Sequence, residues 1–281
     1  MEQLKPPNID KSVVDGFGDE WSRFDQSKLS HEEQMLIFNQ YFAIFPWDLL
    51  AKDASGFDMG CGSGRWAEIV AKRVGTLNVI DASSEAMNVA RVKLSNDKNV
   101  NFFVASVDEI PLADGSQDFG YSLGVLHHIP DTQAALEACV KKIKMGAPFL
   151  VYLYYRFDNK PFWFRAIWSA SDIFRRVISR LPHSGRYLAS QLLAGFIYWP
   201  LAKLSQLVSG LGFGVDGIPL SSYRDKSFYT MRTDALDRFG TRLEQRFTRV
   251  EISEMMLKAG LSDIKFNSSV PYWCAVGLRT R

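Results

Sequence analysis

Three glycines alternate with other residues directly after an acid in the stretch FDMGCGSGRW, which runs from Phe57 to Trp66. Gly60, Gly62 and Gly64 follow Asp58 at the spacing D-x-G-x-G-x-G. Glycine permits positive φ and lets a ligand approach the backbone closely, at a cost in conformational entropy. The stretch therefore predicts a turn that holds a ligand, although three glycines could also serve only to make a tight turn between a strand and a helix.

The residues that follow the glycines predict the elements that position them. Apolar residues recur at helical spacing in RWAEIVAKRV and stop at Gly75, and TLNVIDAS is typical of a short strand that ends at Asp81. Asp81 lies 21 positions after Gly60. A strand, a glycine turn, a helix and a second strand that ends in an acid form a βαβ nucleotide-binding unit. In such a unit the acid accepts hydrogen bonds from a ribose.

The glycine spacing separates two classes of ligand. The dinucleotide fingerprint is G-x-G-x-x-G, and its helix N-terminus faces a pyrophosphate. A carboxylate such as Asp58 beside the loop would repel a pyrophosphate but suits a ligand that carries an ammonium group. The stretch resembles motif I of the class I S-adenosylmethionine (SAM) methyltransferases, whose cofactor has a ribose, an adenine and a methionine ammonium but no phosphate.

Later segments extend this resemblance. Residues 82–94 predict a helix after Asp81, with Ser83 or Ser84 as its N-cap. Residues 100–131 are similar to the third strand, adenine-contacting turn, fourth strand and following histidine pair of the ubiquinone/menaquinone C-methylase-like branch. Ser106 stands where that branch commonly has an acid facing the adenine amino group, and its hydroxyl can still accept a hydrogen bond.

The resemblance implies SAM as cofactor and a set of residues that contact it. These are Asp58, Gly60, Cys61, Gly62, Gly64, Asp81, Ala82, Ser106, Val107, Asp108 and Leu123.

Two histidines are the candidate catalytic residues. His127 and His128 follow the fourth predicted strand, at the carboxyl edge where such sheets bind ligands. Histidine titrates near neutral pH and can act as a general base if the acceptor must lose a proton. We prefer His128 to His127, and either could instead cap the next helix or pack on the sheet. Asp131 is predicted to be an N-cap.

The predicted fold is an α/β sandwich of the Rossmann-like SAM-methyltransferase type. Its mostly parallel sheet would end in an antiparallel strand. We divide the chain into an N-terminal helical cover at 1–50, a SAM-binding core at 51–157, a helical insertion after the fifth strand at 158–230, and a C-terminal completion at 231–281. Capping boxes are predicted at Ser30/Glu33 and Thr248/Glu251, whereas Gly56 makes the first strand a poor β-former.

The insertion is both apolar and basic. The insertion begins with a helical stripe of large apolar residues. Between Arg156 and Gln206 the chain has eight lysines or arginines and two aspartates, a net charge of +6. One interpretation is a helical cap whose stripe packs on the edge of the sheet. The other is an interfacial helix pair, so that 158–206 makes peripheral contact with a membrane. The stripe comprises Phe164, Ile167, Trp168, Phe174, Val177, Ile178 and Leu181.

Two further groups have open roles. Phe17, Trp21 and Phe24 form either a hydrophobic staple, which we favour, or contacts to the sulfonium or the acceptor. A second, polar segment is either an acceptor wall or a connection with internal salt bridges. Its residues are Tyr223, Arg224, Tyr229, Arg232 and Asp237.

Composition and missing motifs exclude several classes of protein and acceptor. The chain has 281 residues, a formal net charge of +2 and 47% hydrophobic residues, as ordinary globular proteins do. Its three cysteines form no metal-type cluster, and we expect no metal, no signal peptide, no membrane-spanning helix and a cytoplasmic location. The segment after the fourth strand has no proline pair to clamp a base, and no basic stripe covers the cofactor half, so a nucleic-acid acceptor is disfavoured.

We therefore expect a SAM-dependent methyltransferase that acts on a small-molecule acceptor, for which an apolar or amphiphilic character is one option. The alternatives are a non-catalytic SAM-binding protein and, less favoured, an NAD-type oxidoreductase. The acceptor atom and the oligomeric state stay open.

Overall fold

The computed structural model describes residues 6–281, so the first five residues of the predicted N-terminal cover lie outside the described residues. The chain divides into two compact units. The sheet unit consists of the N-terminal segment up to Ser22, Ile37–Arg156 and Leu243–Arg281. The helical unit consists of Arg23–Leu36 and Phe157–Arg242.

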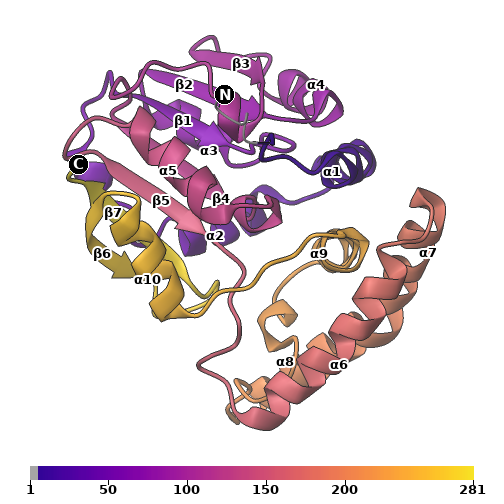
Figure 1. Cartoon of the computed structure of the whole chain (residues 1–281). Coiled ribbons are helices and arrows are strands. Elements are labelled where there is room, and N and C mark those ends of the chain that lie inside the picture. Colours follow the sequence, from indigo (N-terminus) through magenta and orange to yellow (C-terminus); the bar gives the residue numbers. More distant parts are fainter. Residues whose placement is uncertain (1–5) are drawn as a thin grey trace. The chain divides into compact units, whose positions relative to one another are not determined.

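A seven-stranded sheet with the order β3-β2-β1-β4-β5-β7-β6 forms the centre of the sheet unit (Figure 1). The pairs from β3 to β5 are all parallel, and β7 runs antiparallel to both β5 and β6. The predicted Rossmann-like, mostly parallel sheet with an antiparallel terminal strand is therefore confirmed. The strands are β1 (Ser55–Met59), β2 (Thr76–Asp81), β3 (Val100–Val104), β4 (Phe119–Leu123), β5 (Pro148–Tyr152), β6 (Leu261–Phe266) and β7 (Cys274–Arg279).

Gly56 lies within β1 for a packing reason. A Cβ atom at this position would come within 2.2 Å of the Phe119 ring on the neighbouring strand β4. The glycine costs β-propensity, but it makes room for a fully buried aromatic side chain. Strand β1 forms because this packing outweighs the local preference.

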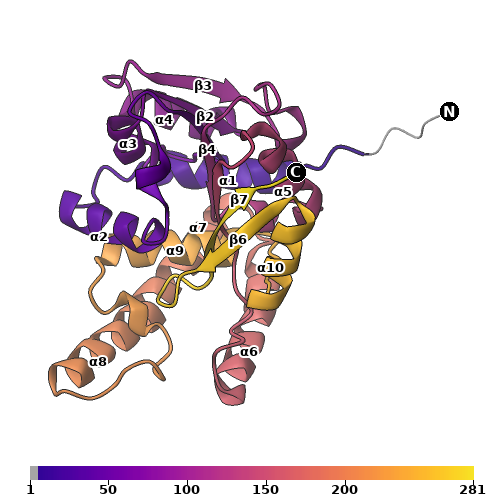
Figure 2. The same cartoon turned by 90° about the vertical axis from the view of Figure 1, so that its left-hand side faces the viewer.

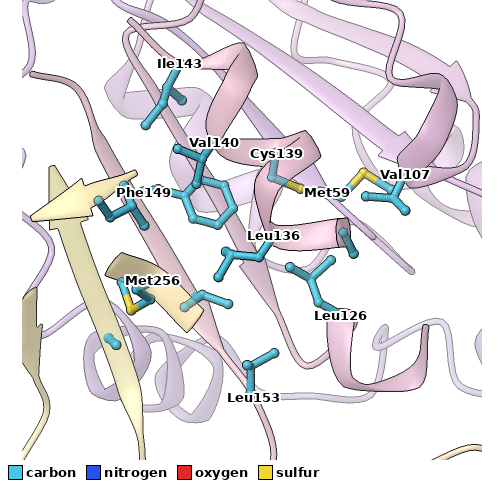
Figure 3. Packing of buried hydrophobic residues seen from close by; sticks show 14 of the residues in the cluster. Met59, Val107, Leu126, Leu136, Cys139, Val140, Ile143, Phe149, Leu153 and Met256 are labelled. Carbon is cyan, nitrogen blue, oxygen red and sulfur yellow. The ribbon is translucent and has the colours of Figure 1, made fainter. Parts of the chain in front are cut away.

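Helices cover both faces of the sheet. On one face α5 (Thr132–Lys142) and α10 (Arg249–Lys258) pack on β1 and β5 through a buried apolar cluster (Figure 3). Leu136 and Val140 of α5, Phe149 of β5 and Met256 of α10 belong to this cluster. On the other face Phe42 contacts Tyr121, with ring centroids 5.3 Å apart, and Phe45 lies 6.0 Å from Phe119.

Side-chain caps fix where three of these helices begin. Ser83 caps α4 (Ser84–Lys93) by accepting from Ala86 N, so the first of the two predicted serines is the N-cap. Asp131 caps α5 by accepting from Ala134 N. The Thr248/Glu251 capping box of α10 is present in full, as predicted.

The predicted box at Ser30/Glu33 forms only in part. Ser30 Oγ accepts from Glu33 N at 3.2 Å, at the start of α2 (His31–Tyr41). The Glu33 carboxylate does not accept from the backbone N–H of Ser30. It accepts instead from Ser227 N at 2.9 Å and from Thr230 Oγ1 at 2.7 Å within the helical unit. A tertiary contact has replaced the local one.

The helical unit contains α6 (Phe162–Ile178), α7 (His183–Leu193), a π-helical turn (Ala194–Tyr198), α8 (Trp199–Gly210) and α9 (Phe228–Gly240) (Figure 2). Pro200 lies in the first turn of α8, directly after the π-helical turn, and its fixed φ suits a helix. The core of the unit is buried Ala194, Tyr198, Ala202, Met231, Ala235 and Phe239. Among residues 6–281, no helix is long and apolar enough to cross a membrane.

Candidate functional site

The glycine loop leaves β1 at the point where the sheet order reverses, between β1 and β4. Open α/β sheets bind ligands at the carboxyl ends of strands at such a switch point. Gly60, Gly62 and Gly64 have φ of 81°, 53° and 76°, values that residues other than glycine rarely adopt. Gly60 N and Cys61 N both donate to Ile80 O, at 2.7 and 3.1 Å, which fixes the loop against β2.

Asp81 connects the glycine loop to the start of α4. Its Oδ2 accepts from Gly62 N and its Oδ1 from Ser83 N, both at 2.9 Å. Burial raises the pKa of Asp81, and the hydrogen bonds from Ser83 and Gly62 act in the opposite direction. The carboxylate is therefore held in one orientation, with lone pairs left for a ligand hydroxyl.

Asp58 is a buried acid beside the same loop. Its side chain is 2% exposed, and it pairs in register with Tyr121 of β4. The pKa of Asp58 is raised to about 8, because burial and the neighbouring Asp81 raise it by more than the hydrogen bond from the Tyr121 hydroxyl lowers it. A cation bound at this carboxyl group would favour its charged form. Burial and both carboxylates raise the pKa of Cys61 well above its usual range, so this thiol stays protonated.

Helix α1 (Lys11–Arg23) lies close over the loop. A Cβ atom on Gly62 would come within 2.8 Å of the Trp21 indole, and one on Gly18 within 2.8 Å of Ser83 Oγ. The Phe17 ring lies 5.0 Å from the His128 ring. Phe24 belongs to the helical unit, where its ring contacts Tyr229 at 5.5 Å. The three aromatic residues that we grouped therefore have different neighbours.

The N-terminal segment also reaches the turns after β3 and β4. Asn8 N donates to Asp108 Oδ2 at 2.5 Å, and Asn8 Nδ2 donates to Asp131 O at 2.8 Å. Ser106 precedes a short 3-10 turn at Val107–Glu109, in which Val107 is buried. Asp108 is exposed and is engaged by Asn8.

All eleven predicted cofactor residues lie at the carboxyl ends of β1, β2, β3 and β4 in the sheet unit. They lie in or directly after the four strands: Asp58, Gly60, Cys61, Gly62 and Gly64 at β1; Asp81, which ends β2, and Ala82, which follows it; Ser106, Val107 and Asp108 after β3; and Leu123, which ends β4.

Both histidines are buried, at 0% and 3% exposed, and they differ in their hydrogen bonds. His127 is fully buried, and neither ring nitrogen has a hydrogen-bond partner among the described residues. Burial lowers the pKa of His127 well below its usual range, and His128 and Arg246 lower it further. His128 Nδ1 lies 2.6 Å from Leu243 O, so Nδ1 carries the proton in the neutral ring and Nε2 is the basic nitrogen.

Four residues that sequence reasoning missed surround the histidines. The Tyr154 ring lies 3.9 Å from the His127 ring, and the Arg246 guanidinium lies 5.0 Å from the centroid of the same tyrosine. Arg246 Nε pairs with Glu244 at 2.6 Å. Burial lowers the pKa of Arg246, but its contacts, Glu244 foremost, together outweigh burial and raise it. Burial raises the pKa of Tyr152 well above its usual range. About 90 residues separate the tyrosines from Glu244 and Arg246 in sequence, so no local spacing could reveal the group.

The predicted polar segment of the insertion makes contacts within the helical unit. Tyr223 Oη donates to Asp234 Oδ2 at 2.8 Å, and Arg232 Nη2 donates to Tyr187 Oη at 2.8 Å. The Tyr229 hydroxyl accepts from Gln26 N at 3.0 Å, and Arg224 lies 3.2 Å from Asp225. Across residues 6–281, no group of three or more histidine, cysteine or acidic side chains could hold a metal ion.

Part of the chain is similar to a known family. Residues 57–151 match the family described as Methyltransferase domain. Among curated proteins, the ubiquinone biosynthesis O-methyltransferase of Erwinia tasmaniensis is 30% identical over 140 residues, which cover 46% of this chain and 56% of the relative. The protein of the same name from Thiobacillus denitrificans is 34% identical over 91 residues, covering 32% and 39%. The chain thus spans about half or less of the length of these curated relatives.

Solved structures support the fold. A candidate methyltransferase from Haloferax volcanii, determined with a methyltransferase activator, has a TM-score of 0.54 at 15% identity, over 94% of this chain and 98% of that one. A candidate O-methyltransferase from Nostoc punctiforme has a TM-score of 0.52 at 11% identity, over 96% and 69%. At such identities the likeness concerns the fold alone.

Proposed function

We propose that the chain, whose residues 57–151 match the family described as Methyltransferase domain, transfers a methyl group from SAM to a small-molecule acceptor. The observation that carries the proposal is the loop of three left-handed glycines between the buried carboxyl group of Asp58 and the half-buried one of Asp81. This donor set suits a ligand with an ammonium group and a ribose diol, and it would repel a phosphate.

In this proposal each strand end has one task in cofactor binding. Asp58 faces the ammonium group, Asp81 accepts from the ribose hydroxyls, and Ser106 with Asp108 lies beside the adenine. SAM supplies an electrophilic methyl group on a sulfonium. The protein then contributes mainly position, because methyl transfer is an in-line displacement that needs the acceptor aligned behind the methyl carbon.

We propose a hydroxyl group on an apolar or amphiphilic molecule as the acceptor. The name of the curated relatives, ubiquinone biosynthesis O-methyltransferase, supports an oxygen acceptor. His128 supports it as well, because its Nδ1–H is fixed by Leu243 O and its Nε2 can take a hydroxyl proton. Arg246 and Glu244 would act through Tyr154 and His127 as positioning residues.

A transfer assay tests the proposal. Purified protein would be incubated with SAM that carries a labelled methyl group and with panels of aromatic hydroxyl compounds, amines and acidic carbon compounds. We expect labelled product and S-adenosylhomocysteine with hydroxyl acceptors of increasing apolar character. SAM binding in calorimetry without turnover on any panel would instead support a non-catalytic SAM-binding protein. Retention of NAD without SAM binding would support an oxidoreductase.

A further inference from the structure

Helix α6 of the helical unit has an inner face centred on a buried arginine and an apolar outer face. Its one buried residue is Arg175, which is 6% exposed. Phe162, Ile173, Phe174 and Val177 of the same helix are 77%, 65%, 65% and 63% exposed. Helices of globular proteins ordinarily bury their apolar residues and expose their arginines. Three members of the predicted apolar stripe, Ile167, Phe174 and Val177, are among the exposed residues of α6.

The exposed apolar residues form one continuous surface, which we call the α6 outer face. At 100° per residue they fall within an arc of about 140°, and no polar residue interrupts it. The face consists of Phe162, Trp163, Ala166, Ile167, Ala170, Ile173, Phe174 and Val177, all exposed. Single exposed apolar residues are normal on a protein surface, but eight on one helix face indicate a binding surface.

Specific polar contacts hold the inner face of α6 in this orientation, with the apolar residues outward. Arg175 Nε donates to Asp172 at 2.6 Å, and Arg175 Nη1 donates to Thr241 O at 2.9 Å. Arg238 Nη2 of α9 donates to Ser171 Oγ at 2.7 Å, and Arg242 Nε donates to Ser179 O at 3.2 Å.

Positive charge lies along one edge of the outer face. Arg165 and Arg176 are exposed. On a helical wheel with Phe162 at 0°, they lie at about 300° and 320°, beside Phe162 and Ile173 at one edge of the face. The single acid of α6, Asp172, is only 13% exposed in its side chain and is bonded to Arg175 and Arg176. A second copy of this helix would therefore offer these arginines no carboxylate, whereas an anionic surface would attract them.

We infer that α6 binds the surface of an anionic lipid bilayer, with its outer face in the boundary between headgroups and acyl chains. Aromatic and aliphatic residues on one face and arginines beside them are the features of an interfacial helix. A helix of 17 residues is about 25 Å long, and none of the described helices could span a bilayer. The contact does not depend on the reaction that the sheet unit performs.

Vesicle sedimentation tests the inference on the full chain. We expect the protein to pellet with phosphatidylglycerol/phosphatidylcholine vesicles at low salt, more weakly at high salt, and poorly with phosphatidylcholine alone. Ile173→Ser and Phe174→Ser should each reduce the partition coefficient about tenfold, since each removes a large apolar side chain from the acyl boundary. Arg165→Gln with Arg176→Gln should reduce the preference for anionic vesicles.

Matched variants and a second measurement keep the result interpretable. Val92→Ser and Leu257→Ser remove exposed apolar side chains, 78% and 52% accessible, from helices of the sheet unit and should leave vesicle binding unchanged. SAM affinity and circular dichroism would verify that all variants fold. The inference fails if the wild type ignores anionic vesicles, or if the α6 variants bind like the wild type. It also fails if sedimentation velocity shows a dimer that Ile173→Ser with Phe174→Ser dissociates, because a second copy then covers the face.

Discussion

At the scale of single residues, the proposed chemistry rests on ionisable groups that burial has moved from their ordinary behaviour. Asp58 and Asp81 are acids whose pKa burial raises, and His127 is a base whose pKa burial lowers. Such groups cluster at functional sites, because a bound ligand can restore the charge that burial disfavours.

Asp81→Asn tests the ribose contact. The amide keeps the size of the side chain but loses the charge and one acceptor, so we expect SAM affinity to fall about 10- to 100-fold, or about 1.5–3 kcal/mol. Calorimetric titration measures this loss, with the exposed Asp53→Asn as control. Unchanged affinity in Asp81→Asn would exclude the assignment.

Asp58 should make the stability of the SAM-free protein depend on pH. Its folded pKa of about 8 lies above the unfolded value near 4, so the unfolded chain loses this proton first as pH rises. The stabilisation that the neutral carboxyl contributes is complete below about pH 4 and declines as pH rises toward 8. Urea unfolding of the wild type and Asp58→Asn across this range should therefore show a stability difference that changes with pH. Parallel curves would mean that Asp58 is ionised throughout.

His128→Ala tests the proposed base. If the acceptor is a hydroxyl group, turnover should fall about 100-fold or more, because proton removal loses its catalyst. SAM affinity should stay the same, since the proposed cofactor contacts come from other strand ends. A variant with the wild-type rate would return His128 to the structural role of binding Leu243 O.

At the scale of elements, helix α1 and the cofactor loops depend on each other through one small residue. Gly18→Ala would place a Cβ 2.8 Å from Ser83 Oγ, which already caps α4 and cannot move without losing that cap. We expect a loss of about 1 kcal/mol in stability and weaker SAM binding. Gly195→Ala is the matched control, because nothing lies within 4 Å of its Cβ, and it should stabilise by about 0.5–1 kcal/mol. Chemical denaturation would show both effects, and equal gains in the two variants would mean that α1 is not held there.

The sequence predicted the elements whose signals are local. Spacings of a few residues predict the glycine loop, the end of β2 at Asp81 and the helix caps Ser83, Asp131 and Thr248. The structure has these features where they were predicted. The Tyr154–Arg246 contact and the Glu33 bond to Ser227 join distant segments, so no periodicity could reveal them. Periodicity also found an apolar stripe in α6 but could not decide which of its members face inward, because Arg175 is held by carbonyl groups 66 and 67 residues away.

At the scale of the whole molecule, the chain combines two units with separate cores. The sheet unit carries every proposed cofactor contact, and the helical unit carries the α6 outer face. The basic segment between Arg156 and Gln206 falls almost wholly in the helical unit, while the rest of the chain is net acidic.

Calorimetry can test this separation. A ligand stabilises the unit that binds it, by about 2.7 kcal/mol at a concentration of 100 times its Kd. We expect SAM to raise the melting temperature of one transition, that of the sheet unit, and to leave the other in place. Asp81→Asn should abolish most of the shift. A single transition that moves as a whole would mean that the two units unfold together.

The position of β7 in the sequence affects how the sheet folds during synthesis. This strand pairs with β5, yet about 120 residues separate the two in sequence. During synthesis, β5 would therefore wait roughly 6–24 s for its partner at ordinary elongation rates. Its Phe149, Leu150 and Val151 are fully buried in the finished protein. Until β7 is made, β5 is therefore an exposed apolar edge strand that can pair with another chain. The nascent chain is most open to aggregation while the apolar helical unit is emerging, and that interval is when a chaperone would have most to protect.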